Sequence, residues 1–231
     1  MQSGYERTEA ERRAICGEAN VLASLYERVT FDEVHRQVLH LMPTNPVRAL
    51  DIGAGTGRDA AALSIRGHTV VAIEPAADLR AVGQRIHATH NIAWVDDNLP
   101  ELRNLGRPCR RFQLVLLTAV WMFLPEAQRH TAAIRLDELL EDGGRLGMVL
   151  RGGPIAADRG MYTVSAAETI SLLTSLGLRL IHQSQQSDSL GRKGVFWNNL
   201  FFEKPSAPEA TGDTSQAGEL PAGRNRGQPS R

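Results

Sequence analysis

The stretch ALDIGAGTGRD, residues 49–59, decides the fold. An apolar run that ends at Ile52 leads into a glycine loop, and a helix-like segment follows from Asp59. The glycines stand at alternate positions, Gly53, Gly55 and Gly57. A strand that turns through glycines into a helix brings bare backbone N–H groups close to a ligand. We therefore expect a nucleotide-cofactor site here, with Ala54 among its contacts, rather than an ordinary strand-to-helix turn.

The loop also indicates which kind of nucleotide it binds. The dinucleotide fingerprint G-x-G-x-x-G has a third glycine for close helix–strand packing, and here that position holds Arg58. Asp51 places a carboxylate at the end of the strand, where like charges ~4 Å apart would cost on the order of 4 kcal/mol. It would therefore repel a pyrophosphate and attract an ammonium or sulfonium group. The loop favours a cationic nucleotide without phosphate.

Composition excludes several classes of protein. The 231 residues include 42% hydrophobic residues, enough for one sizeable core, and 26 basic residues balance 26 acidic ones, which counts against a general nucleic-acid binder. Cys16 and Cys109 have neither metal-ligand spacing nor a disulfide framework, so we expect no metal site and a reducing compartment. No apolar run approaches 18 residues and no signal peptide is evident. We expect a soluble, cytoplasmic protein.

Two helices are predicted ahead of the first strand. The first covers residues 8–29, and the second begins at Thr30 and ends before Pro43. Each opens with a capping box, formed by Thr8 with Glu11 and by Thr30 with Glu33. We therefore treat residues 1–45 as an N-terminal helical extension.

From residue 47 the chain alternates between strand and helix patterns. Predicted strands cover residues 47–52, 69–73, 91–95, 112–120 and 145–150. Predicted helices cover residues 59–66, 76–87 and 125–141. This alternation predicts an α/β fold with a doubly wound, mostly parallel sheet.

The end of the chain follows a different pattern. A helix capped by Ser165 and Glu168 is predicted to stop at Gly177. Two runs, residues 178–185 and 194–203, are joined by a short polar segment and should form an antiparallel hairpin. From residue 205 to 231 the chain is rich in Pro, Gly and Ser without apolar periodicity, so we expect a disordered tail.

Carboxylates end the next two strands. Glu74 follows the second strand, where its two oxygens could accept both hydroxyls of a ribose. Asp96 and Asp97 follow the third, where one carboxylate could accept a hydrogen bond from an adenine amino group. Asp-Asp-Asn is also typical of loops, so either aspartate could have only a structural role. Which of the two contacts adenine stays open.

Together these motifs resemble the class I S-adenosylmethionine-dependent methyltransferases. FQLV at 112–115 and LLEDGG at 139–144 match later motifs of that family, and the resemblance covers about residues 47–202. It implies that residues 46–204 form a seven-stranded sheet in the order 3-2-1-4-5-7-6 with the seventh strand antiparallel. It also implies S-adenosylmethionine as cofactor. The glycine loop and Asp51 would hold its methionine part, Glu74 its ribose, and Asp96 or Asp97 its adenine.

The segment TAVWMFL, residues 118–124, follows the fourth strand, and in this family it usually faces the transferred methyl group. It lacks the Asn/Asp-Pro-Pro-Tyr/Phe motif of enzymes that methylate exocyclic amines of DNA bases, so we expect no DNA substrate. An apolar loop suits a small-molecule acceptor. Thr118 is a candidate cofactor contact. The candidate acceptor contacts are Trp121, Arg151, Tyr26 and His35.

Three of the four acceptor candidates have an alternative role. Trp121 could belong to the core as readily as to the pocket wall. Arg151, after the fifth strand, could clamp a carboxylate or phosphate or be a solvated charge. His35 could act as a base or be a surface residue, and we assign no catalytic residue.

Three other functions remain open. The chain could methylate RNA or protein, it could be a non-catalytic regulatory protein that binds S-adenosylmethionine, or it could be a nicotinamide oxidoreductase. Asp51 and the missing third fingerprint glycine disfavour the last of these. Oligomeric state stays undetermined.

Overall fold

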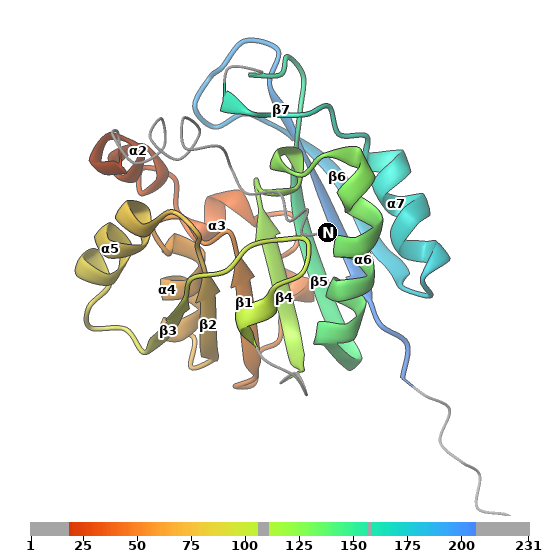
Figure 1. Ribbon diagram of the computed structural model, residues 1–231, viewed down its shortest axis with the longest axis horizontal. Helices are drawn as coiled ribbons and strands as arrows, with labels where there is room; N and C mark the ends of the chain where they lie inside the picture. The colour runs from red at the N-terminus through yellow and green to blue at the C-terminus, as the bar shows by residue number, and fades with distance from the viewer. Residues whose placement is uncertain (1–18, 106–110, 157–158, 207–231) are drawn as a thin grey trace, which may run out of the picture.

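The computed structural model describes residues 19–105, 111–156 and 159–206 (Figure 1). The first predicted helix is described over α2 (Ala19–Tyr26). The capping box expected at Thr8, both cysteines and the tail beyond residue 206 lie outside the described residues. No helix in the described ranges has the length and apolarity needed to cross a bilayer.

The centre of the molecule is a seven-stranded sheet in the order β3-β2-β1-β4-β5-β7-β6. Its strands are β1 (Arg48–Ile52), β2 (Thr69–Ile73), β3 (Ile92–Val95), β4 (Phe112–Thr118), β5 (Leu140–Gly152), β6 (Arg179–Ser187) and β7 (Phe196–Glu203). The pairs among β1 to β5 are parallel, whereas β7 is antiparallel to both of its neighbours. The predicted fold class, strand order and terminal hairpin are confirmed.

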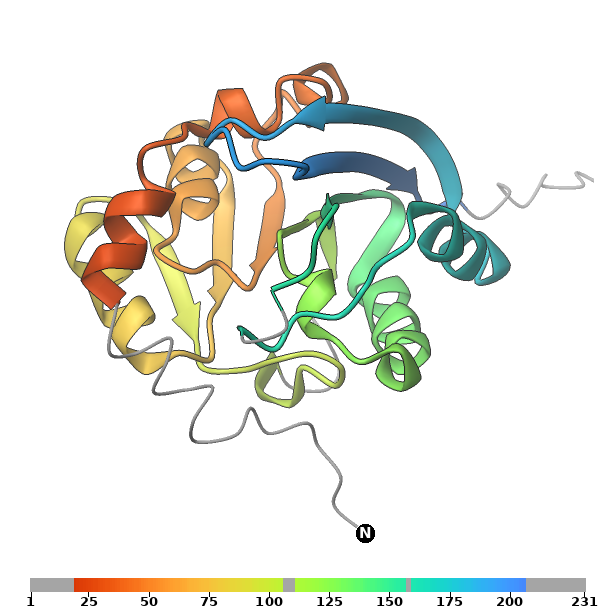
Figure 2. The ribbon, with the colours of Figure 1, turned by 90° about the horizontal axis from the view of Figure 1, so that it is seen from above.

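Helices cover both faces of the sheet (Figure 2). They are α4 (Arg58–Ile65), α5 (Ala77–Ile86), α6 (Glu126–Leu139) and α7 (Ala166–Ser175). Alternate residues of β1 point to opposite faces, so Leu50 and Ile52 join the core under α6 and α7, while Ala49 packs beneath α4. Asp51 shares the face of Ala49 and is therefore directed toward α4.

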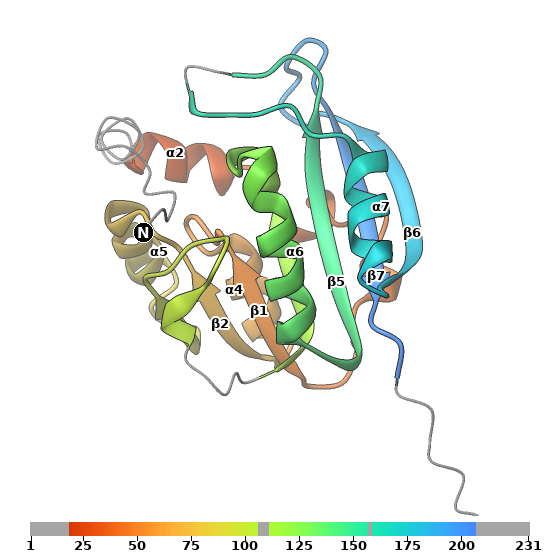
Figure 3. The same ribbon diagram turned by 45° about the vertical axis from the view of Figure 1, so that its right-hand side comes forward.

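The first part of the N-terminal extension, α2, packs along the carboxyl ends of the strands, and Phe31, Val38 and Met42 pack on the sheet face beside α4. Helix α2 lies beside α5, where Ala19 and Ala23 contact Leu79 and Val82 (Figure 3). Small residues on α2 permit this close approach. The extension is thus joined to the main domain by an apolar contact.

The second predicted helix is shorter than expected. Its capping box forms as predicted, with Glu33 N–H donating to Thr30 Oγ1 at 3.2 Å, but α3 covers only Phe31–Val34. The chain turns at His35 because that imidazole is hydrogen-bonded to Asp59 on α4, at 2.8 Å. A short 3₁₀ turn, η1 (Leu39–Leu41), follows in place of a continuous helix.

The helix before β5 was predicted to reach residue 141 and the strand to begin at residue 145, but the strand already contains Asp142, Gly143 and Gly144. Helix α6 ends at Leu139, and β5 begins at Leu140, which pairs with Phe112 across an irregular register. Gly143 adopts φ +75°, and its N–H donates to Lys204 O at 2.8 Å. Pairing with β4 and with the chain after β7 therefore extends this strand beyond its local pattern.

Helix α5 packs directly on the backbone of the glycine loop. A Cβ built at Gly83 would lie 2.6 Å from the carbonyl oxygen of Thr56 and 2.6 Å from the Trp94 ring. Only glycine lets the helix come this close. The position of the loop therefore depends on a residue well beyond it in the chain.

We expect Gly83→Ala to destabilise the protein. Overpacking, about 1–3 kcal/mol, should exceed the gain in helix propensity of up to about 1 kcal/mol. Thermal unfolding measures the effect. Ala81→Gly, at an exposed position of the same helix, calibrates the propensity contribution, and a Gly83→Ala variant more stable than the wild type would contradict the packing argument.

Candidate functional site

A cavity of about 490 Å³ opens at the carboxyl ends of the strands. Its walls come from α2, the glycine loop, the chain after β4, the end of β5 with the segment that follows, and the β6–β7 loop. In the sheet order, β1 and β4 are neighbours at the point where the chain reverses its direction of winding. Open α/β sheets bind ligands at such a switch point, and the volume is typical of a small-molecule site.

The glycine loop approaches the neighbouring segment closely. Gly53 adopts φ +68°, and a Cβ built there would lie 2.4 Å from Val120 in the chain after β4. Gly53, Ala54 and Gly55 line the cavity. Gly57, at φ +87°, instead packs against the Trp94 ring, so its role is to hold the loop on β3.

Glu74 lies beside the loop, as predicted from its place after β2. Its side chain is buried, with one oxygen accepting the Gly55 N–H at 2.9 Å and the other the Ala76 N–H at 2.8 Å. These two bonds fix the carboxylate at the cavity wall. Its proposed contact with ribose stays a prediction.

Asp51 is a buried carboxylate at the cavity wall. Its side chain is 1% exposed, and Oδ2 has no hydrogen-bond partner. Burial raises the pKa of Asp51 well above its ordinary value, and repulsion by Asp59 raises it further, against the lowering effect of Arg58. A buried acceptor without a donor is costly to the protein alone. It suits a ligand that brings a positive charge, which is the type of group that the sequence predicted.

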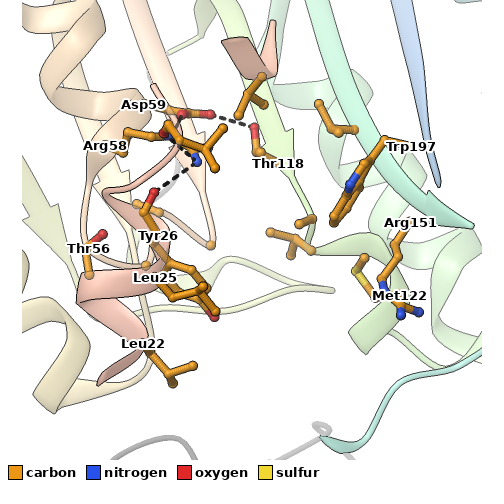
Figure 4. Close-up of a pocket in the computed structure, with 18 of the residues that line it drawn as sticks. Leu22, Leu25, Tyr26, Thr56, Arg58, Asp59, Thr118, Met122, Arg151 and Trp197 are labelled. Atoms are coloured by element: carbon orange, nitrogen blue, oxygen red, sulfur yellow. Dashed lines mark hydrogen bonds and ion pairs between the residues drawn. The ribbon is translucent and has the colours of Figure 1, made fainter. Parts of the chain in front are cut away.

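Asp59 joins three segments and was not predicted as a site residue. One oxygen contacts His35 Nε2 at 2.8 Å and accepts Thr118 Oγ1–H at 2.7 Å, and the other accepts Arg58 Nε–H at 2.7 Å. Burial acts to raise the pKa of Asp59, but the Arg58 guanidinium and the His35 imidazole outweigh it and hold that pKa below its usual value. Figure 4 shows Asp59 and Thr118 together at one side of the cavity.

The loop also binds the N-terminal extension. Thr56 Oγ1–H donates to Glu27 at 2.6 Å, and Arg58 donates to the carbonyls of Tyr26 and Val29, both at 3.5 Å. The residue that replaces the third fingerprint glycine therefore attaches the end of α2 to the loop. Tyr26, predicted as an acceptor contact, lines the cavity together with Leu22 and Leu25.

Neither candidate for the adenine contact lines the cavity. The Asp97 carboxylate is buried and accepts the backbone N–H groups of Asn98, Arg103 and Asn104, so it shapes its own turn. Asp96 is exposed and paired with Arg80 at 2.9 Å. The structure therefore leaves Asp96 as the more accessible of the two.

Two predicted acceptor contacts lie elsewhere. Trp121 is fully buried in the core below α6, so it anchors the segment after β4, while its neighbours Met122 and Phe123 line the cavity. His35 is 2% exposed and lies outside the wall, where it contacts Asp59. It is therefore neither a surface residue nor a base directed at the cavity. Arg151 does line the cavity, as predicted.

The part of the chain that carries the loop matches a known protein family. A family model described as a methyltransferase domain matches residues 49–144, which contain the glycine loop, Glu74 and the chain after β4. No curated protein matches the sequence.

Solved structures of methyltransferases share the fold. The 1,6-didemethyltoxoflavin-N1-methyltransferase of Burkholderia thailandensis, solved with that compound and S-adenosylhomocysteine, aligns with a TM-score of 0.67 at 19% identity, over 89% of this chain and 92% of its own. The N-methyltransferase NodS of Bradyrhizobium japonicum WM9 aligns with a TM-score of 0.60 at 21% identity, over 75% of this chain and 96% of NodS. The glycopeptide N-methyltransferase MtfA, solved with S-adenosylmethionine, aligns with a TM-score of 0.56 at 16% identity, over 74% of this chain and 96% of MtfA.

We expect Asp51→Asn to stabilise the ligand-free protein at neutral pH. The pKa of Asp51 is higher in the folded state than its unfolded value of about 3.9. Protonated Asp51 therefore stabilises the fold at low pH, and this contribution to the free energy of unfolding is lost as the pH rises from the unfolded-state pKa through the folded-state pKa. A tenfold difference between the folded and unfolded acid constants corresponds to about 1.4 kcal/mol, and each kcal/mol to roughly 2–4 °C in Tm.

The measurement is thermal unfolding at pH 4 and pH 7.5. The advantage of Asp51→Asn over the wild type should be larger at pH 7.5. Asp142→Asn, a change at a half-exposed carboxylate outside the cavity, serves as the control and should alter Tm little. A variant that is less stable than the wild type at pH 7.5 would refute the assignment of an unpaired, destabilising carboxylate.

Proposed function

We propose that this chain, whose residues 49–144 match a methyltransferase domain, is a class I S-adenosylmethionine-dependent methyltransferase that transfers a methyl group from this cofactor to a small-molecule acceptor in the cavity described above. When bound, S-adenosylmethionine supplies a methyl group on a sulfonium, which is transferred by in-line displacement. The protein contributes by positioning the two reactants.

The observation that carries the proposal is the buried Asp51 carboxylate beside the glycine loop, whose Oδ2 has no hydrogen-bond partner. The loop side of the cavity has three buried carboxylates, Asp51, Asp59 and Glu74, against the single guanidinium of Arg58. This excess of negative charge fits a ligand with ammonium and sulfonium groups. It disfavours the pyrophosphate of a nicotinamide dinucleotide.

The shape of the cavity supports a small acceptor. Helix α2 and the β6–β7 loop both contribute walls, and Met122, Phe123 and Met161 give the far side an apolar lining. Among the structural neighbours, the Burkholderia thailandensis enzyme was solved with a small molecule, 1,6-didemethyltoxoflavin, bound together with S-adenosylhomocysteine. A cytoplasmic location remains a prediction.

The cofactor assignment is tested by thermal unfolding with S-adenosylmethionine, S-adenosylhomocysteine and NAD in parallel. A ligand at about 100 times its Kd stabilises by about 2.7 kcal/mol, or roughly 5–10 °C for a domain of this size. Turnover is followed as S-adenosylhomocysteine formed on a small-molecule extract, on RNA and on a protein fraction. Turnover on RNA or protein alone would refute a small-molecule acceptor, and binding without turnover would favour a regulatory role.

We expect Glu74→Gln to weaken the binding of S-adenosylhomocysteine by roughly 10–100-fold. A hydrogen bond to a charged group contributes about 1.5–3 kcal/mol, and the amide has one acceptor oxygen to share among the Gly55 N–H, the Ala76 N–H and the ribose hydroxyls. Titration calorimetry measures the Kd. Glu101→Gln, outside the cavity, is the matched control, and unchanged affinity in Glu74→Gln would rule out the ribose contact.

A further inference from the structure

The wall of the cavity opposite the glycine loop is rich in arginine. Arg151 at the end of β5, Arg159 in the segment that follows and Arg192 in the β6–β7 loop all line it. Figure 4 shows Arg151, Trp197 and Met122 across the cavity from Arg58 and Asp59. The two sides of the cavity therefore differ in charge.

Asp188 does not neutralise this wall, because its carboxylate is already occupied. It accepts hydrogen bonds from Arg192 Nη2 at 2.6 Å, from Arg192 Nε at 3.0 Å and from Trp197 Nε1 at 2.9 Å. Its side chain is 3% exposed, and these bonds hold its pKa below the usual value. The pair with Arg192 cancels one positive charge.

The same bonds fix an aromatic surface. With its Nε1–H held by Asp188, the Trp197 ring has a set orientation, and the Arg192 guanidinium lies 5.6 Å from its centre. Trp197 lines the cavity, as does the Met122 side chain. A flat apolar group could pack against this surface.

No carboxylate of the described residues pairs with Arg151 or Arg159. Among the described residues neither forms an ion pair, although Nη1 of Arg151 donates to the Pro154 carbonyl, which holds the side chain in place. Burial lowers the pKa of Arg151, and the nearby charges of Arg192 and Arg159 lower it further, against the effect of Asp188. Within the described ranges, two guanidinium groups at the cavity wall thus form no ion pair.

We propose that the acceptor is a small molecule that carries a carboxylate, bound by Arg151 and Arg159, on a flat apolar body that packs against Trp197. This inference rests on the proposed function and names the substrate class for it. A guanidinium presents parallel N–H donors that match a carboxylate. A dianionic phosphate fits less well, because Asp51, Glu74 and Asp188 line the same cavity.

The test uses the full chain saturated with S-adenosylhomocysteine, so that cofactor binding is established first. The probes are benzoate, cinnamate and indole-3-acetate, each paired with its neutral carboxamide, together with phenyl phosphate. Ligand-observed NMR titration gives each Kd. We expect each carboxylate to bind at least tenfold more tightly than its carboxamide, and benzoate to bind more tightly than phenyl phosphate.

Variants assign the effect to the arginines. Arg151→Met should raise the Kd of the carboxylates at least tenfold and leave that of the carboxamides unchanged, and Arg151→Lys should restore part of the affinity. Arg159→Met, at an exposed side chain, should weaken carboxylate binding independently of how Arg151→Met folds. Arg103→Met, an exposed arginine outside the cavity, is the matched control.

The outcomes separate the two proposals. Failure of the wild type to bind S-adenosylhomocysteine would overturn the proposed function. With that binding intact, the carboxylate proposal is overturned if no carboxylate binds, if acids and amides bind equally, if phenyl phosphate binds more tightly than benzoate, or if both arginine variants bind carboxylates as the wild type does.

Discussion

The arrangement of the site depends on one buried carboxylate. The Asp59 carboxylate accepts hydrogen bonds from Arg58, its neighbour at the start of α4, and from Thr118 at the end of β4, and it contacts His35 of the N-terminal extension. Leaving a buried charge without its partner costs about 3–5 kcal/mol, so each of these segments is held in place by the other two. The extension is therefore part of the architecture that holds the glycine loop.

The two sides of the cavity differ in charge. The loop side has more carboxylates than guanidinium groups. On the opposite wall the Asp188 carboxylate is hydrogen-bonded to Arg192 and Trp197, and the guanidinium groups of Arg151 and Arg159 are in excess. A cationic donor and an anionic acceptor would each find a complementary end. The reacting groups of donor and acceptor would then meet between the two charged ends of the cavity, whose wall includes Thr118 and Val120. The charges of the two walls would in this way orient both reactants.

Much of the fold was predictable because its signals are local. Strand β2 has the predicted bounds, and the caps at Thr30 and Ser165 form as expected, since side-chain chemistry within a few residues determines them. The early start of β5 was missed because it depends on pairing with distant strands. The short α3 was missed for a similar reason, since the contact of His35 with Asp59 ends it.

The candidate site divides in the same way. Asp51 and Glu74 were identified because they end adjacent strands, a position visible in the sequence. Asp59 was not predicted as a site residue. The available signal was its position on the buried face of α4, where the other residues are apolar. For Trp121 the sequence left the core and the pocket wall open, because a large apolar side chain suits both, and packing places it in the core.

The walls of the cavity come from very different parts of the chain. The matched methyltransferase domain, residues 49–144, contains the glycine loop and Glu74, whereas α2, Arg151, Arg159 and the β6–β7 loop lie outside it. The matched domain therefore supplies part of the cavity wall, and the segments before and after it supply the rest. Point changes, insertions or recombination after residue 144 could alter the arginine-rich wall while residues 49–144 are inherited unchanged.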